Sequence, residues 1–418
     1  MTLPLAPIAD DAEHEAFTAS LFGAFGWPPL DQEQLAGWRS IHERDRSIAA
    51  RDGTQIVGTA GAFSHTMAVP GAQVRSAGVT VVSVTQTHRR RGVLRSMMTS
   101  QLADVRDRGE GTAALWASEV PIYTRYGYGV ASWHCGLDVE THRSSYTAEG
   151  AAVLARSEAR LRQLPDAEGA VAPCDAVLRQ VAEQVPGTLA RPRAVWLART
   201  LRDTPDDRGG ATPQYHLLAE APDGTPLGYA LYRILNKGTA VGSPDGVVQV
   251  TEVQAVDAPT AALLWRHLLD TDLCTSLVAR LQPLAHPLLL LLAEPRRTRS
   301  VVKEGLLVRV VDLPKALQER HYAAAVDVVL QVADPVCPWN EGRWRVVADT
   351  DGPAEVTRTD ADADLVLGAS ELGASYLGST TLTQLARAGR VAELVPGTLR
   401  AASRALSWDV PAFCPEIF

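Results

Sequence analysis

Apolar and polar positions alternate along the chain in short blocks, and the period of the alternation changes from block to block. The first two blocks have helical spacing, over Glu13–Phe25 and Gln32–His42. Strand-like runs follow on both sides of Asp52-Gly53, a dipeptide that favours a tight hairpin turn. The β-branched run Gly78–Thr85 predicts a further buried strand. Another strand is expected over Thr112–Ser118, which places a mixed first segment before about residue 150.

A basic turn and a helix come directly after the run Gly78–Thr85. The letters H-R-R-R-G-V-L-R-S-M-M occupy positions 88–98, and the residues that share one helical face are Leu94, Met98, Leu102 and Val105. A strand, a glycine-containing turn and a helix direct backbone N–H groups and the positive helix end at one point. We therefore expect the turn to bind an anion; the alternatives are a solvated basic turn and a nucleic-acid contact.

The second segment, at 151–300, partly repeats the first. Asp223-Gly224 precedes strand-like residues as Asp52-Gly53 does, and the run Val250–Val256 echoes Val79–Val84. The letters that follow, D-A-P-T-A-A-L-L-W, contain neither arginine nor glycine. Any α/β chain can show one such echo by chance. Two echoes in the same order favour a duplicated unit whose second copy has lost the anion-binding turn and binds no cofactor.

In the third segment, at 301–418, strands precede helices, which is an α+β pattern. The strand-like runs are L-L-V-R-V-V-D-L, A-V-D-V-V-L-Q-V and W-R-V-V-A-D, the last two separated by a turn through Asn340-Glu341-Gly342. Helical spacing follows at A-S-E-L-G-A-S-Y-L and T-L-T-Q-L-A-R-A. Since no low-complexity linker separates the segments, we expect closely packed domains at 1–150, 151–300 and 301–418.

The composition excludes several classes of partner. The chain has 40 Lys+Arg and 48 Asp+Glu, a formal net charge of −8, so it is a poor general binder of nucleic acid. Its longest apolar stretch, Leu288–Ala293, is too short to span a bilayer. The opening residues lack the basic start of a secretion signal, so we expect a cytoplasmic protein.

Metal sites and disulfides are not expected either. The five cysteines are scattered and include no C-x-x-C pair. Asp360, Asp362 and Asp364 alternate with small residues, but the glycine and the final glutamate of a calcium loop are missing. They are interpreted as an acidic turn.

The basic turn carries a family resemblance. The loop T-Q-T-H-R-R-R-G-V-L-R after V-V-S-V resembles the acetyl-CoA loop of the GNAT (Gcn5-related N-acetyltransferase) superfamily, with Leu94 in place of the usual final small residue. With A-S-E-V-P-I-Y-T-R-Y-G-Y-G downstream and Phe418 at the end, the chain is similar to the enhanced intracellular survival (Eis) family. The resemblance implies an α/β (α+β) fold of two tandem GNAT-like units and a sterol-carrier-protein-like domain.

The same residues suit a coenzyme A diphosphate on physical grounds. Gly92 permits close backbone approach, the amides of Arg90–Arg95 donate, and the guanidinium groups offer bidentate contacts. The amide-rich pantetheine arm would pair with a strand edge as an added strand does. The predicted acetyl-CoA-binding residues are Val82, Ser83, Val84, Arg90, Arg91, Gly92, Val93, Leu94, Arg95, Ser118 and Glu119.

Amide transfer from a thioester needs a base near the amine and a weak acid near the leaving sulfur. Three tyrosines, at 123, 126 and 128, lie close together, and their spacing alone does not choose among them. The family pattern I-Y-x-R-x-G-Y-G selects Tyr123 as the general acid. The resemblance assigns the base to the α-carboxylate of Phe418. The alternative is a frayed tail, whereas the apolar sequence A-F-C-P-E-I-F suits a docked chain end.

The acceptor is less defined. The family builds its acceptor cleft on the first two helices, where Phe22, Phe25 and Trp38 lie, and Glu416 would attract a cation. All four are predicted acceptor-binding residues; for the three aromatic residues, the alternative is a place in the core. Family members carry acidic residues where this chain has Ala24 and Ile417, so the resemblance implies acetyl transfer to a polyamine-like amine more strongly than it implies aminoglycoside activity.

Other readings of the acceptor and the function stay open. A protein-lysine acetyltransferase is one, and a non-enzymatic protein that binds an apolar ligand is another. The resemblance also implies a homo-oligomer, a hexamer.

Overall fold

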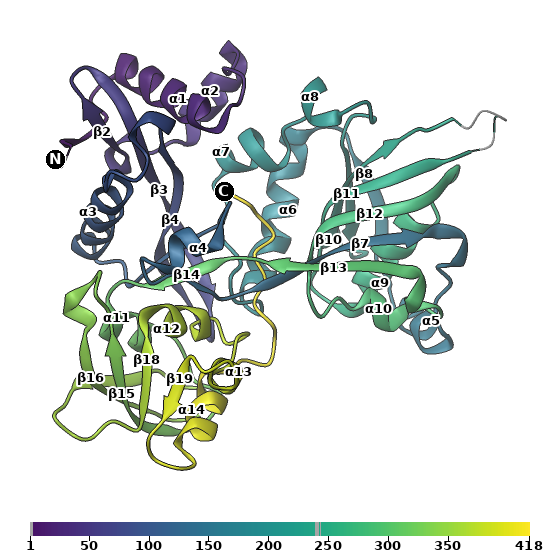
Figure 1. The fold of residues 1–418 in the computed structure, drawn as a ribbon. Coiled ribbons are helices and arrows are strands. Elements are labelled where there is room, and N and C mark those ends of the chain that lie inside the picture. Colours follow the sequence, from purple (N-terminus) through teal and green to yellow (C-terminus); the bar gives the residue numbers. More distant parts are fainter. Residues whose placement is uncertain (1–2, 239–241, 243) are drawn as a thin grey trace. The chain divides into compact units, whose positions relative to one another are not determined.

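The computed structural model of the protein describes residues 3–238, 242 and 244–418 and divides into two compact units (Figure 1). Unit 1 comprises Met1–Ser132 and Gly305–Phe418, and unit 2 comprises Trp133–Glu304. Unit 2 is therefore an insertion in unit 1. The N–H of Gly305 donates to the carbonyl of Ser132 at 2.9 Å, so the two ends of the insertion meet.

Unit 1 contains a seven-stranded sheet in the order β1-β2-β3-β4-β5-β14-β6. The hairpin predicted at Asp52-Gly53 is confirmed, with β2 and β3 antiparallel and Gly53 at φ 59°. The strands are β1 (Leu5–Pro7), β2 (Ile48–Asp52), β3 (Gln55–Val69), β4 (Ala72–Val84), β5 (Thr112–Leu115), β6 (Gly129–Val130) and β14 (Leu307–Val310). The helices are α1 (Asp11–Phe25), α2 (Gln32–Ile41), α3 (Val93–Asp107) and α4 (Val120–Thr124).

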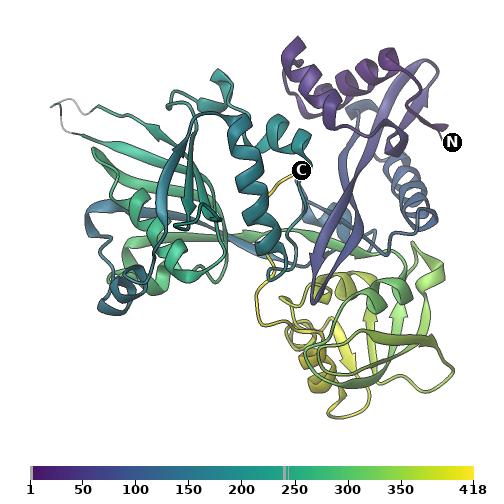
Figure 2. The same cartoon turned by 180° about the vertical axis from the view of Figure 1, so that it is seen from behind.

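Helices cover both faces of this sheet (Figures 1 and 2). On one face, Phe17 of α1 packs against Ala49 and Ile56. On the other, Met97 of α3 packs against Val57 and Ala60 of β3. Side chains alternate between the faces of a strand, so each position of β3 and β4 belongs to either the α1 face or the α3 face.

Strand β14 joins unit 1 from far along the chain. It begins the segment that the sequence pattern places in the third region, yet Leu307 pairs with Leu115 of β5 and with Val130 of β6. Its residues are fully buried because sheet neighbours flank it on both sides. Strand β5 also ends at Leu115, three residues before the predicted end at Ser118.

Unit 2 has its own seven-stranded sheet, in the order β13-β7-β12-β11-β10-β9-β8. The predicted second hairpin is present, since β9 and β10 pair antiparallel around Asp223-Gly224. The strands are β7 (Trp133–Glu140), β8 (Arg160–Leu164), β9 (Tyr215–Glu220), β10 (Pro226–Leu235), β11 (Gly246–Ala255), β12 (Cys274–Pro283) and β13 (Thr298–Glu304). The helices are α5 (Ala148–Leu154), α6 (Ala167–Ala182), α7 (Arg193–Val195), α8 (Pro205–Arg208), α9 (Ala258–Leu269) and α10 (Leu288–Leu291).

The remaining part of unit 1 is a five-stranded sheet with helices, in the order β17-β16-β15-β18-β19. Its strands are β15 (Val326–Ala333), β16 (Gly342–Ala348), β17 (Ala354–Arg358), β18 (Leu365–Gly368) and β19 (Val391–Glu393). Its helices are α11 (Leu313–Glu319), α12 (Ala369–Ser375), α13 (Leu382–Arg387) and α14 (Thr398–Leu406). The last residues after α14 form an extended tail, drawn in yellow in Figure 1. Within the described part of the chain, no helix combines the length and apolarity needed to cross a bilayer.

Candidate active site

The predicted anion loop has the geometry of an open helix N-terminus. Gly92 is the N-cap of the 15-residue helix α3, at φ 85°, and no side chain caps the helix there. Arg90 also has a positive φ of 63°. A Cβ added at Gly92 would meet nothing within 4 Å, so the approach to the first helical N–H groups is open. Four such N–H groups start every α-helix without an internal partner, and here they face a position that an anion can reach.

Hydrogen bonds of His88 and Arg89 hold the start of the loop. The imidazole Nε2 of His88 lies 3.0 Å from Asp52 Oδ2, and its Nδ1 lies 2.8 Å from Thr87 Oγ1. The guanidinium of Arg89 donates to the carbonyl of Val84 at 3.3 Å. His88 is buried. These bonds fix the chain on the β2–β3 turn, so the next residues leave it at a defined point.

The other predicted loop residues divide by exposure. Arg90, Arg91 and Arg95 are exposed around the helix end, whereas Val93 is buried and Leu94 packs into the core beneath. A pocket of about 220 Å³ adjoins them, lined by Leu3, Leu5, Arg91, Gly92, Val93, Arg95 and Ser96.

Strands β4 and β5 part in the middle of the sheet. Their parallel register runs only from Ser76↔Thr112 to Gly78↔Ala114, while β4 continues to Val84. A register shift follows on the other side, where Val81 has a positive φ of 50°. The bulge turns β4 away from β5. The predicted pantetheine-binding stretch, Val82 to Val84, therefore lies beyond the last pair with β5.

Tyr123 lies on α4, the helix that follows β5 in the chain. Its side chain is 8% exposed and belongs to the core on the α3 face of the sheet, to which Val82 and Leu94 also pack. Burial, with a smaller effect of Tyr126, raises the pKa of Tyr123 to about 12, so the hydroxyl stays protonated at neutral pH. Ser118 and Glu119, both exposed, precede α4.

The chain's tail returns to the same sheet. Residues 412–416 are buried, and the N–H of Ala412 donates to Ser379 Oγ at 2.5 Å. The phenyl ring of Phe418 is 8% exposed and meets the imidazole of His65 on β3, with ring centroids 4.7 Å apart at 64°. Burying a phenylalanine contributes about 1.5–3 kcal/mol, which favours a docked end over a frayed one. Figure 2 shows the tail running back from α14.

The four predicted acceptor residues fall into three places. Trp38 contacts Phe63 on β3, with centroids 6.3 Å apart, and Phe63 contacts His65 at 5.8 Å. Phe22 and Phe25 instead gather around the exposed Trp27, with centroids at 5.5 and 4.6 Å. Glu416 is buried in the tail, and its backbone carbonyl accepts from Cys414 Sγ at 3.1 Å.

Sequence reasoning missed three residues of this region. Phe63, His65 and Gly78 lie on the α1 face of the β3–β4 hairpin, with Phe63 paired to Gly78. Alternation along β3 could have placed Phe63 and His65 on one face, but nothing local shows that the chain end meets them.

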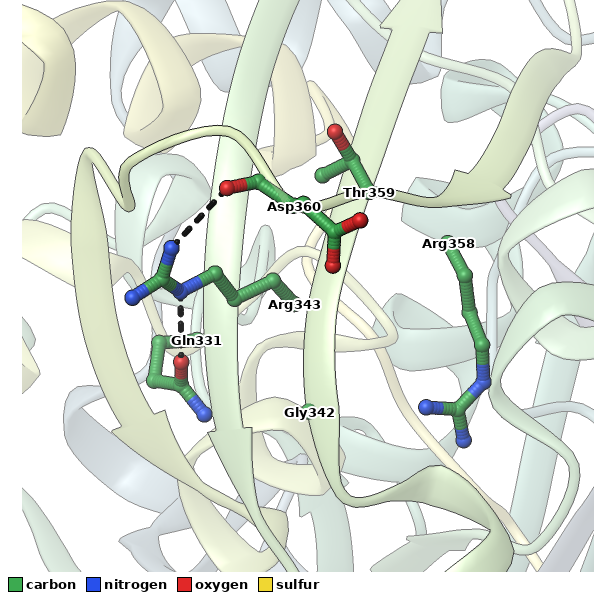
Figure 3. A pocket seen from close by; sticks show the side chains of 6 residues that line it. All are labelled: Gln331, Gly342, Arg343, Arg358, Thr359 and Asp360. Carbon is green, nitrogen blue, oxygen red and sulfur yellow. Dashed lines mark hydrogen bonds between the residues drawn. The ribbon is translucent and has the colours of Figure 1, made fainter.

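A pocket on the third sheet does not resemble a lipid site. It is lined by Gln331, Gly342, Arg343, Arg358, Thr359 and Asp360 (Figure 3). Arg343 donates to Gln331 Oε1 and to the carbonyls of Asp360 and Ala361, and Arg358 donates to the carbonyls of Trp339 and Glu341. The two arginines hold strand ends and a loop together. This polar lining gives no support to the alternative of an apolar-ligand carrier.

Metal chemistry has no candidate site in the described residues, where no group of three or more His, Cys, Asp or Glu side chains is arranged to hold an ion.

Three family models match the chain. Acetyltransferase (GNAT) domain models match residues 8–131 and 187–310, and a sterol carrier protein domain model matches residues 313–415. The predicted fold class is thereby confirmed. Together with the open N-terminus of α3, these matches define the protein as an acetyltransferase of the GNAT type.

Relatives extend over nearly the whole chain. An uncharacterized N-acetyltransferase of Streptomyces avermitilis is 42% identical over 400 residues, covering 96% of this chain and 96% of its own. N-acetyltransferase Eis of Mycobacterium bovis is 33% identical over 395 residues, covering 91% and 92%. The crystal structure of Eis1 from Mycobacterium abscessus superposes with a TM-score of 0.84 at 29% identity, covering 99% and 100%. The chain belongs to the Eis family of N-acetyltransferases.

Proposed function

We propose that the protein transfers an acetyl group directly from acetyl-CoA to a primary amine of a polyamine-like or aminoglycoside acceptor. Tyr123 is the general acid and the α-carboxylate of Phe418 is the base. The observation that carries the proposal is the docked tail: the ring of Phe418 lies on the β3–β4 hairpin, beside the place where β4 and β5 part.

The residues present fit a coenzyme A diphosphate. Gly92 leaves the N-terminus of α3 without a side-chain cap and unobstructed, and Arg90, Arg91 and Arg95 are exposed beside it. Backbone N–H groups and guanidinium donors would hold the diphosphate. The edge of β4 from Val82 to Val84 would pair with the pantetheine arm, since its register with β5 has ended. Ser118 and Glu119 complete this proposed set.

The two proposed catalytic groups belong to opposite faces of one sheet. Tyr123 packs on the α3 face, whereas the Phe418 ring lies beside Gly78 and His65 on the α1 face. Acetyl-CoA supplies an activated thioester. The Tyr123 hydroxyl holds its proton at neutral pH and would give it to the leaving sulfur. The Phe418 carboxylate would take a proton from the amine, directly or through water.

The acceptor proposal is limited to amines. Trp38, Phe22 and Phe25 supply aromatic surface near α1 and α2, and the terminal carboxylate supplies the negative charge that an alkylammonium needs. Ala24 and Ile417 stand where acidic residues are expected, so a less cationic amine is accepted more readily than in an acidic cleft. Turnover of aminoglycosides, diamines and lysine peptides, measured as thiol release from acetyl-CoA, separates these classes of acceptor and also tests the protein-lysine alternative.

The test of the base is positional. Extending the chain by a few residues converts the Phe418 carboxylate into a neutral amide while keeping the apolar contacts of the tail. Deleting Phe418 moves the carboxylate back by up to about 3.5 Å. Both variants should bind acetyl-CoA and lose most transfer activity, because a base outside hydrogen-bond reach does not act. Full turnover by the extended protein would remove Phe418 from the mechanism.

The expected hexamer is part of the same proposal. Its measurement is the molar mass in solution by light scattering.

A further inference from the structure

The terminal ring occupies a site built around a glycine. Gly78 is the last residue of β4 that pairs with β5, and it also pairs with Phe63 of β3. The imidazole of His65 lies over it: a Cβ built on Gly78 would be 2.2 Å from His65 Cδ2 and 2.5 Å from its Nε2. The same Cβ would be 3.1 Å from Cε2 of Phe418. The rings of His65 and Phe418 thus both pack against the backbone of Gly78.

The glycine lies within the sheet, and the imidazole is packed among other rings. Strand pairing on both sides holds the backbone of Gly78 in the sheet. His65 and Phe63 are both buried, and their ring centroids are 5.8 Å apart. Trp38 of α2 backs Phe63 in turn, at 75° between the ring planes. A methyl group at position 78 would therefore displace the imidazole and disturb its contact with the ring of Phe418.

We propose that Gly78 and His65 are positioning residues that set where the terminal carboxylate lies. The inference rests on the proposed role of that carboxylate as the base. The phenyl ring locates the last residue against His65 at the point where β4 and β5 part, and the carboxylate is one bond from its Cα. The neighbouring side chain of Ile417 is 57% exposed, so the side chain that is buried at this end is that of Phe418.

The first test compares two glycine substitutions on sheet strands. Gly78→Ala should lower kcat at least tenfold while the KM for acetyl-CoA changes less than twofold, because the diphosphate site at Gly92 is untouched. Gly136→Ala, on β7 of unit 2, is the matched control: its Cβ would lie at least 3.5 Å from its neighbours, an ordinary contact. The control should keep wild-type kcat. A wild-type kcat for Gly78→Ala would overturn the proposal.

The second test does not depend on whether Gly78→Ala folds. His65→Ala removes the ring that meets Phe418, whereas His65→Phe keeps an aromatic ring in its place. We expect His65→Ala to lower kcat at a constant acetyl-CoA KM, and His65→Phe to recover most of the loss. Equal activity of the two variants, or equal loss in both, would contradict a positioning role for the ring.

The chain extension separates this inference from the proposed function. If the extended chain is inactive and the Gly78 and His65 variants turn over normally, the carboxylate is the base and the positioning role is wrong. If the extended chain is fully active, the base assignment itself fails. Thermal unfolding of each variant checks that losses of kcat are not losses of folded protein.

Discussion

The two GNAT-type units place a helix after a sheet strand in the same way and finish its N-terminus differently. In unit 1, Gly92 caps α3 without a side chain, and the first N–H groups stay open. In unit 2, Asp257 caps α9, and its carboxylate accepts from the N–H of Thr260 at 2.7 Å. A carboxylate at an N-cap occupies the position where an external anion would bind. The second unit thus satisfies with its own side chain one of the N–H donors that stay open in the first unit.

The side chains on the two corresponding strands, β4 of unit 1 and β11 of unit 2, also differ in their hydrogen-bond partners. In unit 2, Glu252 of β11 is buried and accepts from Tyr229 Oη at 2.6 Å and from Arg191 at 2.9 Å. In unit 1 the corresponding stretch of β4 carries small or apolar side chains. The hydroxyl of Ser83 there lies 2.7 Å from the hydroxyl of Thr59 on the neighbouring strand β3. A buried ion pair stabilises a fold only when both of its partners are present. An unpaired strand edge, in contrast, can form hydrogen bonds with an added strand or ligand.

Substitution of Tyr123 should give the largest effect. Tyr123→Phe keeps the packing and removes the proton, so kcat should fall by roughly 10²-fold with acetyl-CoA binding retained. Tyr126→Phe, in the same cluster, should change kcat little. Steady-state kinetics with both variants decide, and a larger loss at Tyr126 would reassign the general acid. Since the pKa of Tyr123 is raised to about 12, its titration should not appear in the pH profile of kcat below about pH 10.

Substitution at the open helix end should follow in size. Gly92→Val blocks backbone approach and strains a residue at φ 85°. The KM for acetyl-CoA should rise by about 10- to 100-fold, equivalent to losing one or two charge-assisted hydrogen bonds. Normal acetyl-CoA affinity in this variant would show that the diphosphate binds elsewhere.

Acid should weaken both units through buried neutral histidines. In unit 1, burial and the nearby His14 and Arg44 lower the pKa of His42 to about 4. In unit 2, burial lowers the pKa of His286 to about 3. Between about pH 6.5 and 4 the unfolded chain binds more protons, so stability is full above pH 6.5 and declines as pH falls. Urea unfolding at pH 7 and 5 should show a loss on the order of 1–2 kcal/mol per histidine. A non-titrating His42→Gln variant should flatten the pH dependence of unit 1, and an unchanged slope would contradict the assignment.

Removing the cap in unit 2 should have the smallest effect. Asp257→Ala should lower the free energy of unfolding by about 1 kcal/mol, the usual value of an N-cap. It should leave the KM for acetyl-CoA unchanged, because residues 250–265 around the start of α9 include no arginine, whereas Arg90, Arg91 and Arg95 surround the start of α3. A changed KM would mean that unit 2 also contacts the co-substrate.

The local elements were largely predictable from sequence. Both Asp-Gly hairpins, the strand before the arginines and helix α3 are present because period and turn chemistry act over a few residues. The open helix end could also be predicted, since Gly92 precedes a long apolar-faced helix.

Long-range pairing was not predictable in the same way. Nothing in L-L-V-R-V-V-D-L shows that Leu307 enters the first sheet, because a buried strand has the same apolar sequence pattern in whichever sheet it lies. The meeting of His65, Gly78 and Phe418 depends on sheet register and on the path of the tail, and neither has a local signature. For the same reason Trp38 and Phe25 could not be told apart: one contacts Phe63 and the other is 42% exposed.

The hydrogen bond between Gly305 and Ser132 also bears on the order of folding. Unit 2 is one continuous stretch, Trp133–Glu304, whereas the first sheet needs β14 to link β5 to β6. A ribosome working from the N-terminus therefore completes unit 2 while the first sheet still lacks an interior strand. With N and O only 2.9 Å apart, a two-residue turn could join Ser132 to Gly305 in place of unit 2.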